Sequence, residues 1–303
     1  MSNQQTVITC YLRGGLGNQL FQIFNALRNA LKYDSKIVFT NATIISGHRP
    51  TYWLSLLDVL QKYVLPINYS DFKTVIREKG FEYNSLDADV LSITTIDNSQ
   101  YQKILFDGYF QSPKYFDDVY QIIYHCLRIA EKQEMVRAKL VNMNFDLTNA
   151  VSMHFRLGDY KKFPNHHPVL KKEYYVDALK HISLHSPETI THVLYFCEDD
   201  HEDIKEVQKI ICVLKETFPS MQFTSILSLS GTNTLVDWEE MLAMSCCTHH
   251  IIANSTFSWW GAYLSNSNNN SNKIVCYPSI WFGPAINHHN TKDLFPLEWT
   301  RIN

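Results

Sequence analysis

Several features that mark large classes of protein are missing from this 303-residue sequence. No apolar run approaches the roughly 20 residues of a membrane-spanning helix. A secretory signal is missing too, because the start is polar and the first apolar run, 7–12, is shorter than the required stretch of about 7–15 residues. The net charge is −3, so no positive field would recruit nucleic acid or an anionic membrane. We therefore expect a cytoplasmic protein with no integral membrane segment and no nucleic-acid partner.

Cysteine pairs with zinc-ligand spacing are also missing. The seven cysteines are an odd number and contain no CxxC pair. Several lie in apolar runs, as Cys197 and Cys276 do, and that setting is typical of buried, reduced thiols. The sequence thus indicates a reducing compartment and no disulfide framework.

Two kinds of apolar pattern alternate along most of the chain. Short apolar runs predict strands at 7–12, 36–39, 104–106, 151–155, 192–196, 222–225, 249–253 and 273–276. Apolar residues at helical spacing predict helices at 20–31, 53–60, 113–140, 173–184, 202–218, 235–245 and 256–264. Such alternation is typical of α/β proteins, in which crossover helices connect parallel strands.

The length suggests about two domains. A polar stretch at 142–149 lies between a predicted helix and a predicted strand, so we place the boundary there, with domains 1–146 and 147–303. Residues 41–100 give a mixed pattern, and 265–272 form a polar, low-complexity loop.

A glycine-rich turn at 13–18 joins the first predicted strand to the first helix. Glycines at such a junction let a ligand approach the backbone, and a helix N-terminus favours an anion. The spacing differs from the GxGxxG of dinucleotide-binding turns. The alternative is a tight turn without a ligand, in which Asn18 and Gln19 only cap the helix.

A second candidate site lies at 154–160, just after a predicted strand. The period of two places His154 and Arg156 on one side of the strand end, which is where open α/β sheets bind ligands. Arg156 can fork onto phosphate oxygens, and Asp159 could take a proton from an incoming hydroxyl. The alternative is an Arg156–Asp159 ion pair that only holds a loop.

The third candidate, 253–261, follows an apolar strand and opens a helix. Hydroxyl side chains gather at this helix start, where free N–H groups and the helix dipole suit a diphosphate. The alternative is an N-cap with surplus hydroxyls, and we expect Trp259 and Trp260 to belong to the core. A fourth stretch, 198–200, is acidic; it could ligate a metal, but we favour a helix cap.

These stretches together resemble the inverting α1,2-fucosyltransferases of glycosyltransferase family 11, with bacterial and blood-group H-type members. The likeness rests on four segments that occur in the family's order: 14–22, 108–116, 154–160 and 254–262. It covers most of the chain and is weakest over 41–100. The resemblance implies a GT-B-type fold, with two Rossmann-like domains whose parallel sheets face a cleft.

The resemblance also implies an activity. Fucose would move from GDP-fucose to the 2-hydroxyl of a β-galactose in a glycan acceptor, with inversion and without a metal or another cofactor. The C-terminal domain would bind most of GDP-fucose, and the N-terminal domain would face the acceptor.

Site roles follow from the same resemblance. His154 would contact the guanosine, Arg156 would hold the diphosphate, and Asp159 is the candidate base. The remaining donor-binding residues that it implies are Gly15, Gly17, Asn18, Asn254, Ser255, Thr256, Phe257 and Ser258. Where the family carries an acid that reads guanine, this chain has Glu240, with Asp237 one helical turn earlier; either could serve.

Two other classes remain open from the residues alone. A nicotinamide oxidoreductase would fit the alternation, although GxGxxG and an acid at the end of the second strand are missing. A non-catalytic nucleotide- or sugar-binding module would fit the abundant aromatic residues. Tyr52, Trp53, His48 and Arg49 either line an acceptor groove or belong to the core of a loop.

Overall fold

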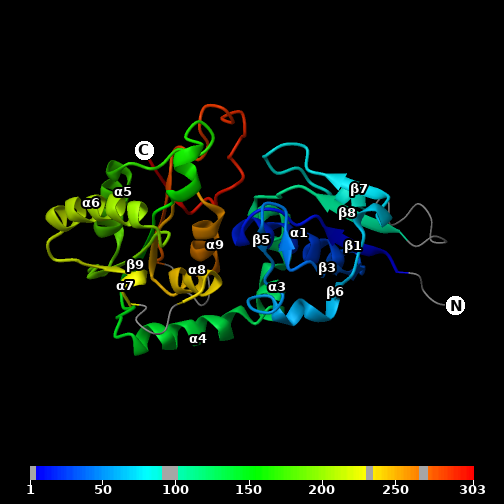
Figure 1. Ribbon diagram of the computed structural model, residues 1–303, viewed down its shortest axis with the longest axis horizontal. Coiled ribbons are helices and arrows are strands. Elements are labelled where there is room, and N and C mark those ends of the chain that lie inside the picture. Colours follow the sequence, from blue (N-terminus) through cyan, green and yellow to red (C-terminus); the bar gives the residue numbers. More distant parts are fainter. Residues whose placement is uncertain (1–4, 91–101, 230–234, 266–271) are drawn as a thin grey trace. The chain divides into compact units, whose positions relative to one another are not determined.

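The computed structural model describes residues 5–90, 102–229, 235–265 and 272–303, and Figure 1 shows its course. The chain forms two compact units: unit 1 comprises 1–129 with 289–296, and unit 2 comprises 130–288 with 297–303. Each unit contains a parallel sheet connected by helices. The predicted α/β class with parallel sheets is therefore confirmed.

Unit 1 ends before the boundary that we predicted after residue 146. Helix α4 (Ile129–Asn142) explains the difference, because it packs on unit 2. The Gln133 amide donates to the Ser245 hydroxyl at 2.7 Å. The chain also returns to unit 1 at 289–296, which no sequence pattern indicates. Domains 1–146 and 147–303, and a cleft between them, stay predictions.

Unit 1 is built on a parallel sheet in the order β2-β1-β8-β7. Its strands are β1 (Val7–Cys10), β2 (Lys36–Ile37), β7 (Thr74–Arg77) and β8 (Lys103–Asp107). Helix α1 (Leu16–Lys32) follows β1 and packs on it. Because β2 lies on one side of β1 and β8 on the other, the strand order reverses between β1 and β8.

Short elements fill the segment between β2 and β7. They are β3 (Phe39–Thr40), which pairs with β6 (Val64–Leu65), β4 (Ile44–Ile45), which pairs with β5 (Arg49–Pro50), and the 3-10 turn η2 (Tyr69–Asp71). The helix predicted at 53–60 is wrong, because turns there lead into a 3-10 helix, η1 (Asp58–Tyr63). Trp53 is buried and packs on Phe39, with ring centroids 5.2 Å apart. Aromatic packing, rather than a helical repeat, sets the apolar spacing of this segment.

The single helix predicted at 113–140 is also wrong. The 3-10 turns η3 (Pro113–Tyr115) and η4 (Asp117–Val119) precede α3 (Tyr120–Cys126), and α4 follows after a break. Arg128 makes this break, because its φ of +54° lies in the left-handed region that ends helices. The predicted Ser112 cap does form, and its hydroxyl accepts from the Lys114 N–H at 3.3 Å.

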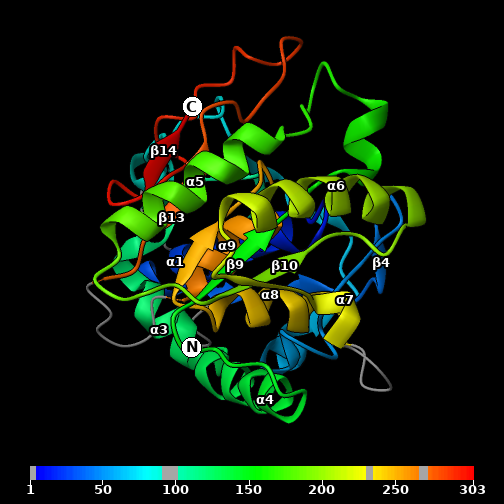
Figure 2. The same ribbon diagram turned by 90° about the vertical axis from the view of Figure 1, so that its left-hand side faces the viewer.

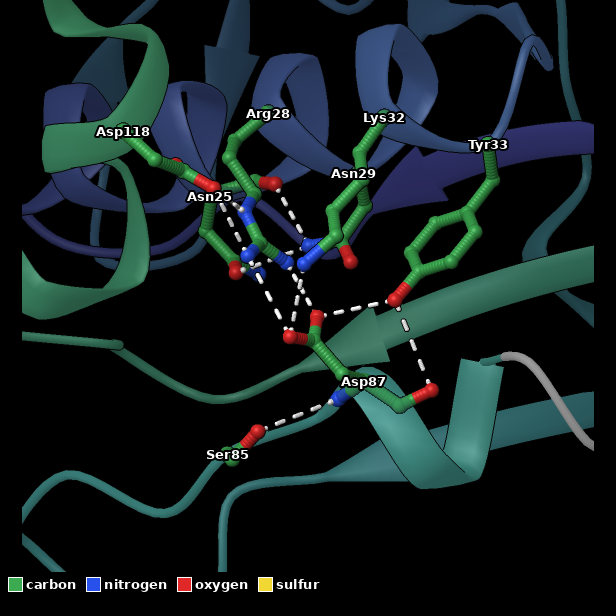
Figure 3. A network of polar contacts seen from close by, with 8 residues as sticks. All are labelled: Asn25, Arg28, Asn29, Lys32, Tyr33, Ser85, Asp87 and Asp118. Carbon is green, nitrogen blue, oxygen red and sulfur yellow. Dashed lines mark hydrogen bonds and ion pairs between the residues drawn. The ribbon is translucent and has the colours of Figure 1, made fainter.

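A charged network fastens the segment around residue 87 to helix α1. Arg28, buried on α1, forms ion pairs with Asp87 (2.5 Å) and Asp118 (2.9 Å), and Figure 3 shows its guanidinium between them. Asp87 also accepts from Lys32 at 2.7 Å and from the Tyr33 hydroxyl at 2.8 Å. Hydrogen bonds from Arg28, Lys32 and Tyr33 outweigh burial and hold the Asp87 pKa well below its usual range.

Unit 2 is built on a larger parallel sheet in the order β11-β10-β9-β12-β13-β14. Its strands are β9 (Ala150–His154), β10 (His192–Phe196), β11 (Gln222–Ser225), β12 (His249–Ile251), β13 (Val275–Pro278) and β14 (Thr300–Ile302). Its other helices are η5 (Gly158–Lys162), α5 (Lys172–His185), α6 (His201–Thr217), α7 (Ile226–Leu229), α8 (Asp237–Ser245) and α9 (Thr256–Leu264). The strands and helices predicted in this half are confirmed, with ends that differ by at most two residues. The predicted loop 265–272 lies almost entirely outside the described residues.

Helices cover both faces of this sheet, and its central strands β9 and β12 are fully buried. Helices α5 and α6 pack together on one face, and α8 lies on the other, where it packs against α9 (Figure 2). Trp259 and Trp260 of α9 are fully buried, which confirms their predicted place in the core. No described helix combines the length and the apolar character that a bilayer crossing requires.

Candidate active site

The order of strands in unit 2 marks one place for a ligand. The chain runs from β9 to β10 and β11 on one side, and then returns to β12 on the other side of β9. Connections after β9 and after β12 therefore leave toward opposite faces, which opens a crevice at the carboxyl ends of these two strands. The predicted segments 154–160 and 254–258 follow these two strands, so the topology brings them together.

Arg156 lies at the carboxyl end of β9 between two carboxylates. Its Nη2 pairs with Asp159 at 2.5 Å, and its Nη1 pairs with Glu198. Register explains the second contact: His154 lies opposite Phe196 on β10, and Arg156 and Glu198 each come two residues later. The ion pair with Asp159 that we considered as an alternative does form, and the Arg156 side chain keeps 21% exposure.

The loop after β9 is fixed on helix α6. Asp203, itself buried, accepts from the Gly158 N–H at 2.7 Å and pairs with Lys161 at 2.6 Å. Gly158 has a φ of +36°, and a Cβ there would come within 2.1 Å of Glu198 Oε2. A glycine is thus needed for Glu198 to reach Arg156.

Tyr160 supports Arg156 from below its guanidinium plane. The Arg156 Cζ atom lies 5.0 Å from the Tyr160 ring centroid, and His167 stacks on Tyr160 at 4.7 Å. The Tyr160 hydroxyl donates to the Asn254 carbonyl at 2.9 Å, which links the two loops of the crevice. A cation above an anchored ring is held in place by the ring's negative face.

The acidic stretch 198–200 does not converge on a metal site. Asp200 caps α6, as we expected, and accepts from the N–H groups of Glu202 (3.0 Å) and Asp203 (3.1 Å). Glu198 instead turns to Arg156. Over the described ranges, no three His, Cys, Asp or Glu side chains are grouped as metal ligands would be.

His154 ends β9 and is buried beside the crevice. Its ring lies 5.7 Å from the Phe257 ring at the start of α9. Burial, and to a lesser degree Arg156, lowers the His154 pKa to about 3, so the imidazole is neutral near pH 7. Its Nδ1 atom has no hydrogen-bond partner among the described residues. A neutral imidazole can offer this ring nitrogen to a ligand.

The start of α9 is held by hydrogen bonds of its serine hydroxyls. Ser255 is the N-cap, and its hydroxyl accepts from the Phe257 N–H at 3.3 Å. Ser258 is buried, and its hydroxyl bonds to the Ala253 N–H and the Ser255 carbonyl. The geometry favours a structural part for Ser258, and the positive end of the helix dipole lies at this first turn.

Asn254 is buried directly before this cap. Its amide nitrogen donates to the Pro168 carbonyl at 3.0 Å and to the Trp281 carbonyl at 3.2 Å. These bonds join three loops at the rim of the crevice. Asn254 therefore shapes the site through the backbone that it positions.

Glu240 lies in the first turn of α8, a helix that precedes β12. Burial, and then the charges of Asp237 and Asp199, raise the Glu240 pKa to about 7. Asp237 is exposed at the same helix end. The charge of Asp199, which follows β10, acts on Glu240, so this acid lies toward the carboxyl end of that strand.

The predicted glycine-rich turn belongs to unit 1, where it begins α1. Gly14 has a φ of +78°, and a Cβ there would meet the Asn18 side chain. Gly15 is the N-cap of α1, without a side-chain cap; it has ordinary φ and open space around its Cβ position. Neither backbone strain nor steric crowding within the protein requires a glycine at position 15. A glycine there leaves room for a ligand to approach the backbone closely. Gly17 is buried in the first turn.

Asn18 and Gln19 do not act as caps of α1. Gln19 donates to the Gly14 carbonyl at 3.1 Å and the Pro50 carbonyl at 2.9 Å, so it braces the turn. Asn18 accepts from the Gln111 amide at 3.0 Å. Gln111 belongs to the segment 108–116, which had no assigned part in the site.

Sequence reasoning named most of this cluster but missed three members. The structure joins His154, Arg156 and Asp159 to Tyr160, Glu198 and His167. Tyr160 was visible in the segment 154–160 as an aromatic residue next to charges. Glu198 was visible only as part of an acidic run, and its partner lies 42 residues away.

A family model described as "Glycosyl transferase family 11" matches residues 2–303. The chain belongs to glycosyl transferase family 11. It is therefore a glycosyltransferase, and the nicotinamide oxidoreductase that the alternation left open is wrong.

Relatives of this family 11 chain span nearly its whole length. An alpha-1,2-colitosyltransferase from Escherichia coli is 26% identical over 325 residues, with 98% of this chain and 99% of that protein covered. A galactoside 2-alpha-L-fucosyltransferase from Caenorhabditis elegans is 24% identical, with 98% of this chain and 79% of that protein covered. Among solved structures, the fucosyltransferase NodZ from Bradyrhizobium gives a TM-score of 0.44 at 13% identity, with 87% of this chain and 93% of that chain covered.

Proposed function

We propose that this enzyme transfers L-fucose from GDP-β-L-fucose to the 2-hydroxyl of a β-galactose in a glycan. Membership of family 11 and the similarity to a galactoside 2-alpha-L-fucosyltransferase support this donor and linkage. The single observation that carries the proposal is Arg156, a permanent cation at the reversal of strand order that is linked through Tyr160 to Asn254, which precedes α9. A diphosphate is the group that such a pair of features binds best.

The donor would lie along the carboxyl ends of β9 and β12. Arg156 would hold the diphosphate together with the N-terminal end of α9, where the helix dipole is positive. His154, buried and neutral, would contact the guanosine, and Glu240 would accept hydrogen bonds from the guanine edge. Asn18 of unit 1 would reach the diphosphate or the fucose, with Gly15 exposing its backbone to the same ligand.

The chemistry would depend on charge that develops on the leaving group. As the bond from C1 of fucose to GDP breaks, negative charge grows on the diphosphate, and a preorganised Arg156 stabilises it more in the transition state than in the ground state. Asp159 would then accept the proton of the acceptor hydroxyl, which attacks C1 from the opposite side and inverts it. The diphosphate would free Asp159 by replacing its carboxylate on Arg156. We propose that no metal takes part and that the enzyme acts in the cytoplasm.

A second donor deserves a test, because one relative of nearly full coverage is an alpha-1,2-colitosyltransferase. Colitose is fucose without its 3-hydroxyl, so the two donors share GDP, the 6-methyl group and the leaving-group chemistry. Side-by-side initial rates with GDP-fucose and GDP-colitose decide between them.

The first experiment measures GDP release from GDP-fucose with lacto-N-biose or N-acetyllactosamine as acceptor, in the presence of EDTA. Wild type is compared with Arg156→Ala, whose turnover we expect to fall at least about 100-fold, since one donor to a developing oxyanion contributes about 3–4 kcal/mol. Arg137→Ala is the matched control. Arg137 lies in the same unit and also pairs with a carboxylate three residues away.

Each outcome has a distinct meaning. Acceptor-dependent release that survives EDTA and is lost only in Arg156→Ala supports the donor, the independence from metal and the role of Arg156. Binding of GDP-fucose without any transfer would favour a non-catalytic binding protein. A protein that neither binds nor turns over either donor would contradict the proposal.

A further inference from the structure

A second reversal of strand order lies in unit 1, between β1 and β8. Strand β1 leads into Arg13, and β8 ends at Asp107 and leads into Tyr109. The rule that places ligands at the carboxyl ends of strands beside such a reversal applies to this sheet as well. The donor residues proposed above leave these three side chains unused.

The three side chains form one compact group. Arg13 pairs with Asp107 through Nη2, and each side chain is 29% exposed. The Arg13 guanidinium lies between two phenol rings, 4.9 Å from the Tyr11 centroid and 5.6 Å from the Tyr109 centroid. The Arg13 backbone is fixed by Gln22, which accepts from its N–H at 3.0 Å and donates to its carbonyl at 3.1 Å.

Tyr109 is held outward by a clamp on its own backbone. Glu78, which follows β7, accepts from the N–H of Tyr109 at 2.7 Å and from that of Phe110 at 2.9 Å. A Cβ on Gly108 would lie 2.4 Å from Glu78 Cβ, so the clamp requires glycine there. Phe110 takes a positive φ of +53° and is fully buried, which pins the loop from below. Tyr109 itself keeps 37% exposure.

This composition is that of a sugar subsite. An exposed aromatic ring fits the apolar C–H face of a pyranose, and a carboxylate beside a guanidinium offers acceptors and donors for neighbouring hydroxyls. Asp107 pairs with Arg13 and also with Arg77 at 3.4 Å, so a carboxylate already occupies the cations that a phosphate would need. We infer that Tyr109, Arg13 and Asp107 bind the β-galactose of the acceptor, with the ring of Tyr109 under the sugar and the ion pair at its hydroxyls.

The assignment rests on the proposed transfer to a galactoside and places its acceptor on unit 1. Two residues that the sequence suggested for an acceptor groove do not compete, because Tyr52 and Trp53 are buried at 6% and 4% exposure. The turn that holds Gly15 begins directly after Arg13, so the subsite adjoins a segment proposed to reach the donor.

The test uses Tyr109→Ala, Tyr109→Phe and Asp107→Asn in the full chain. Tyr63→Ala is the matched control, since Tyr63 has 36% exposure in the same unit and also lies beside a cation, Lys62, at 5.0 Å. We expect Tyr109→Ala and Asp107→Asn to raise the KM for N-acetyllactosamine about ten-fold, with the KM for GDP-fucose changed less than about two-fold. Tyr109→Phe, which keeps the ring, should stay near wild type.

Saturation-transfer NMR with methyl β-galactoside in the presence of GDP reports the subsite without turnover. Binding that Tyr109→Ala abolishes and Tyr63→Ala keeps, in a protein that transfers nothing, would retain the subsite and overturn the proposed reaction. Transfer with an unchanged acceptor KM in both Tyr109→Ala and Asp107→Asn would overturn the subsite and leave the reaction standing. An equal rise in the KM for GDP-fucose would assign the group to the donor and also overturn the inference. Thermal unfolding of each variant identifies any loss that comes from misfolding.

Discussion

The guanidinium of Arg156, at the end of β9, is paired with Glu198, which follows the neighbouring strand β10. A donor diphosphate would need the same nitrogen atoms. In the proposed complex the phosphate would displace Glu198, which would also leave a negative charge beside GDP.

Replacing Glu198 by Gln should tighten GDP binding. The side chain is 42% exposed, so the competing ion pair is weak, and we expect a gain of about two- to five-fold in affinity. Isothermal titration calorimetry with GDP at low and moderate salt measures this affinity. Glu216→Gln, the same charge change at an exposed site on α6, is the control and should leave the affinity unchanged. Weaker GDP binding in Glu198→Gln would mean that the carboxylate positions Arg156 instead of competing for it.

Tyr160 offers a test of how Arg156 is held. Tyr160→Leu removes the ring below the guanidinium, and we expect kcat/KM for GDP-fucose to fall about ten-fold. Tyr160→Phe keeps the ring and loses the hydroxyl, which bonds to the Asn254 carbonyl and to Arg156, so kcat/KM should stay within about three-fold while the protein loses about 1 kcal/mol of stability. Equal losses of kcat/KM in both variants would show that the hydroxyl, and not the ring, matters.

Local patterns explain why so much of unit 2 was predictable. Its strands are apolar runs between helices with clear amphipathic spacing, so β10 and α6 follow directly from the sequence. The candidate phosphate site was predictable for the same reason, because Arg156 and Ser255 stand directly after such strands.

What the sequence could not indicate depends on long-range contacts. The break at Arg128 needs a non-glycine residue in the left-handed conformation, which no composition signals. The return of 289–296 to unit 1 depends on Asp293, which accepts from Lys114 and from the Tyr83 N–H. The contact of Glu198 with Arg156 required the register of two strands. None of these is a local property of the chain.

The network around Arg28 predicts an acid-dependent loss of stability. The Asp87 pKa is depressed chiefly by hydrogen bonds from Arg28, so its contribution is present above its unfolded pKa of about 3.9 and is lost as the pH falls below that value. Because Asp87 is 38% exposed, we expect Asp87→Asn to reduce the free energy of unfolding at pH 7 by only about 1–2 kcal/mol. The difference from wild type should shrink below about pH 4.

Urea unfolding at pH 7 and pH 3.5 measures this effect. Asp89→Asn is the matched control, because Asp89 is 43% exposed and its ion pair with Lys79 is longer, at 3.6 Å. It should cost less than about 0.5 kcal/mol at either pH. Equal losses in Asp87→Asn and Asp89→Asn would contradict a specific contribution of the Arg28 network.

Glu240 should make GDP binding depend on pH in the physiological range. Its pKa is raised to about 7 by burial and by the charges of Asp237 and Asp199, so the side chain is a neutral acid below pH 7 and a carboxylate above it. Only the carboxylate accepts from both N–H donors of guanine. Affinity for GDP should therefore rise as the pH increases from 6 to 8, whereas Glu240→Gln should bind about ten-fold more weakly at pH 8 and show no such rise.

Stability should change in the opposite direction. A Glu with a raised folded pKa stabilises the protein below its unfolded pKa of about 4.3, and that contribution is lost as the pH rises to about 7. The free energy of unfolding of Glu240→Gln should thus exceed that of wild type by up to about 3 kcal/mol at pH 8 and by little at pH 4.5.

Asp237→Asn separates the two acids. If Glu240 reads guanine, removing the neighbouring charge shifts the pH midpoint of GDP binding to a lower value and keeps the affinity. A loss of GDP affinity in Asp237→Asn, with Glu240→Gln unaffected, would assign the guanine contact to Asp237.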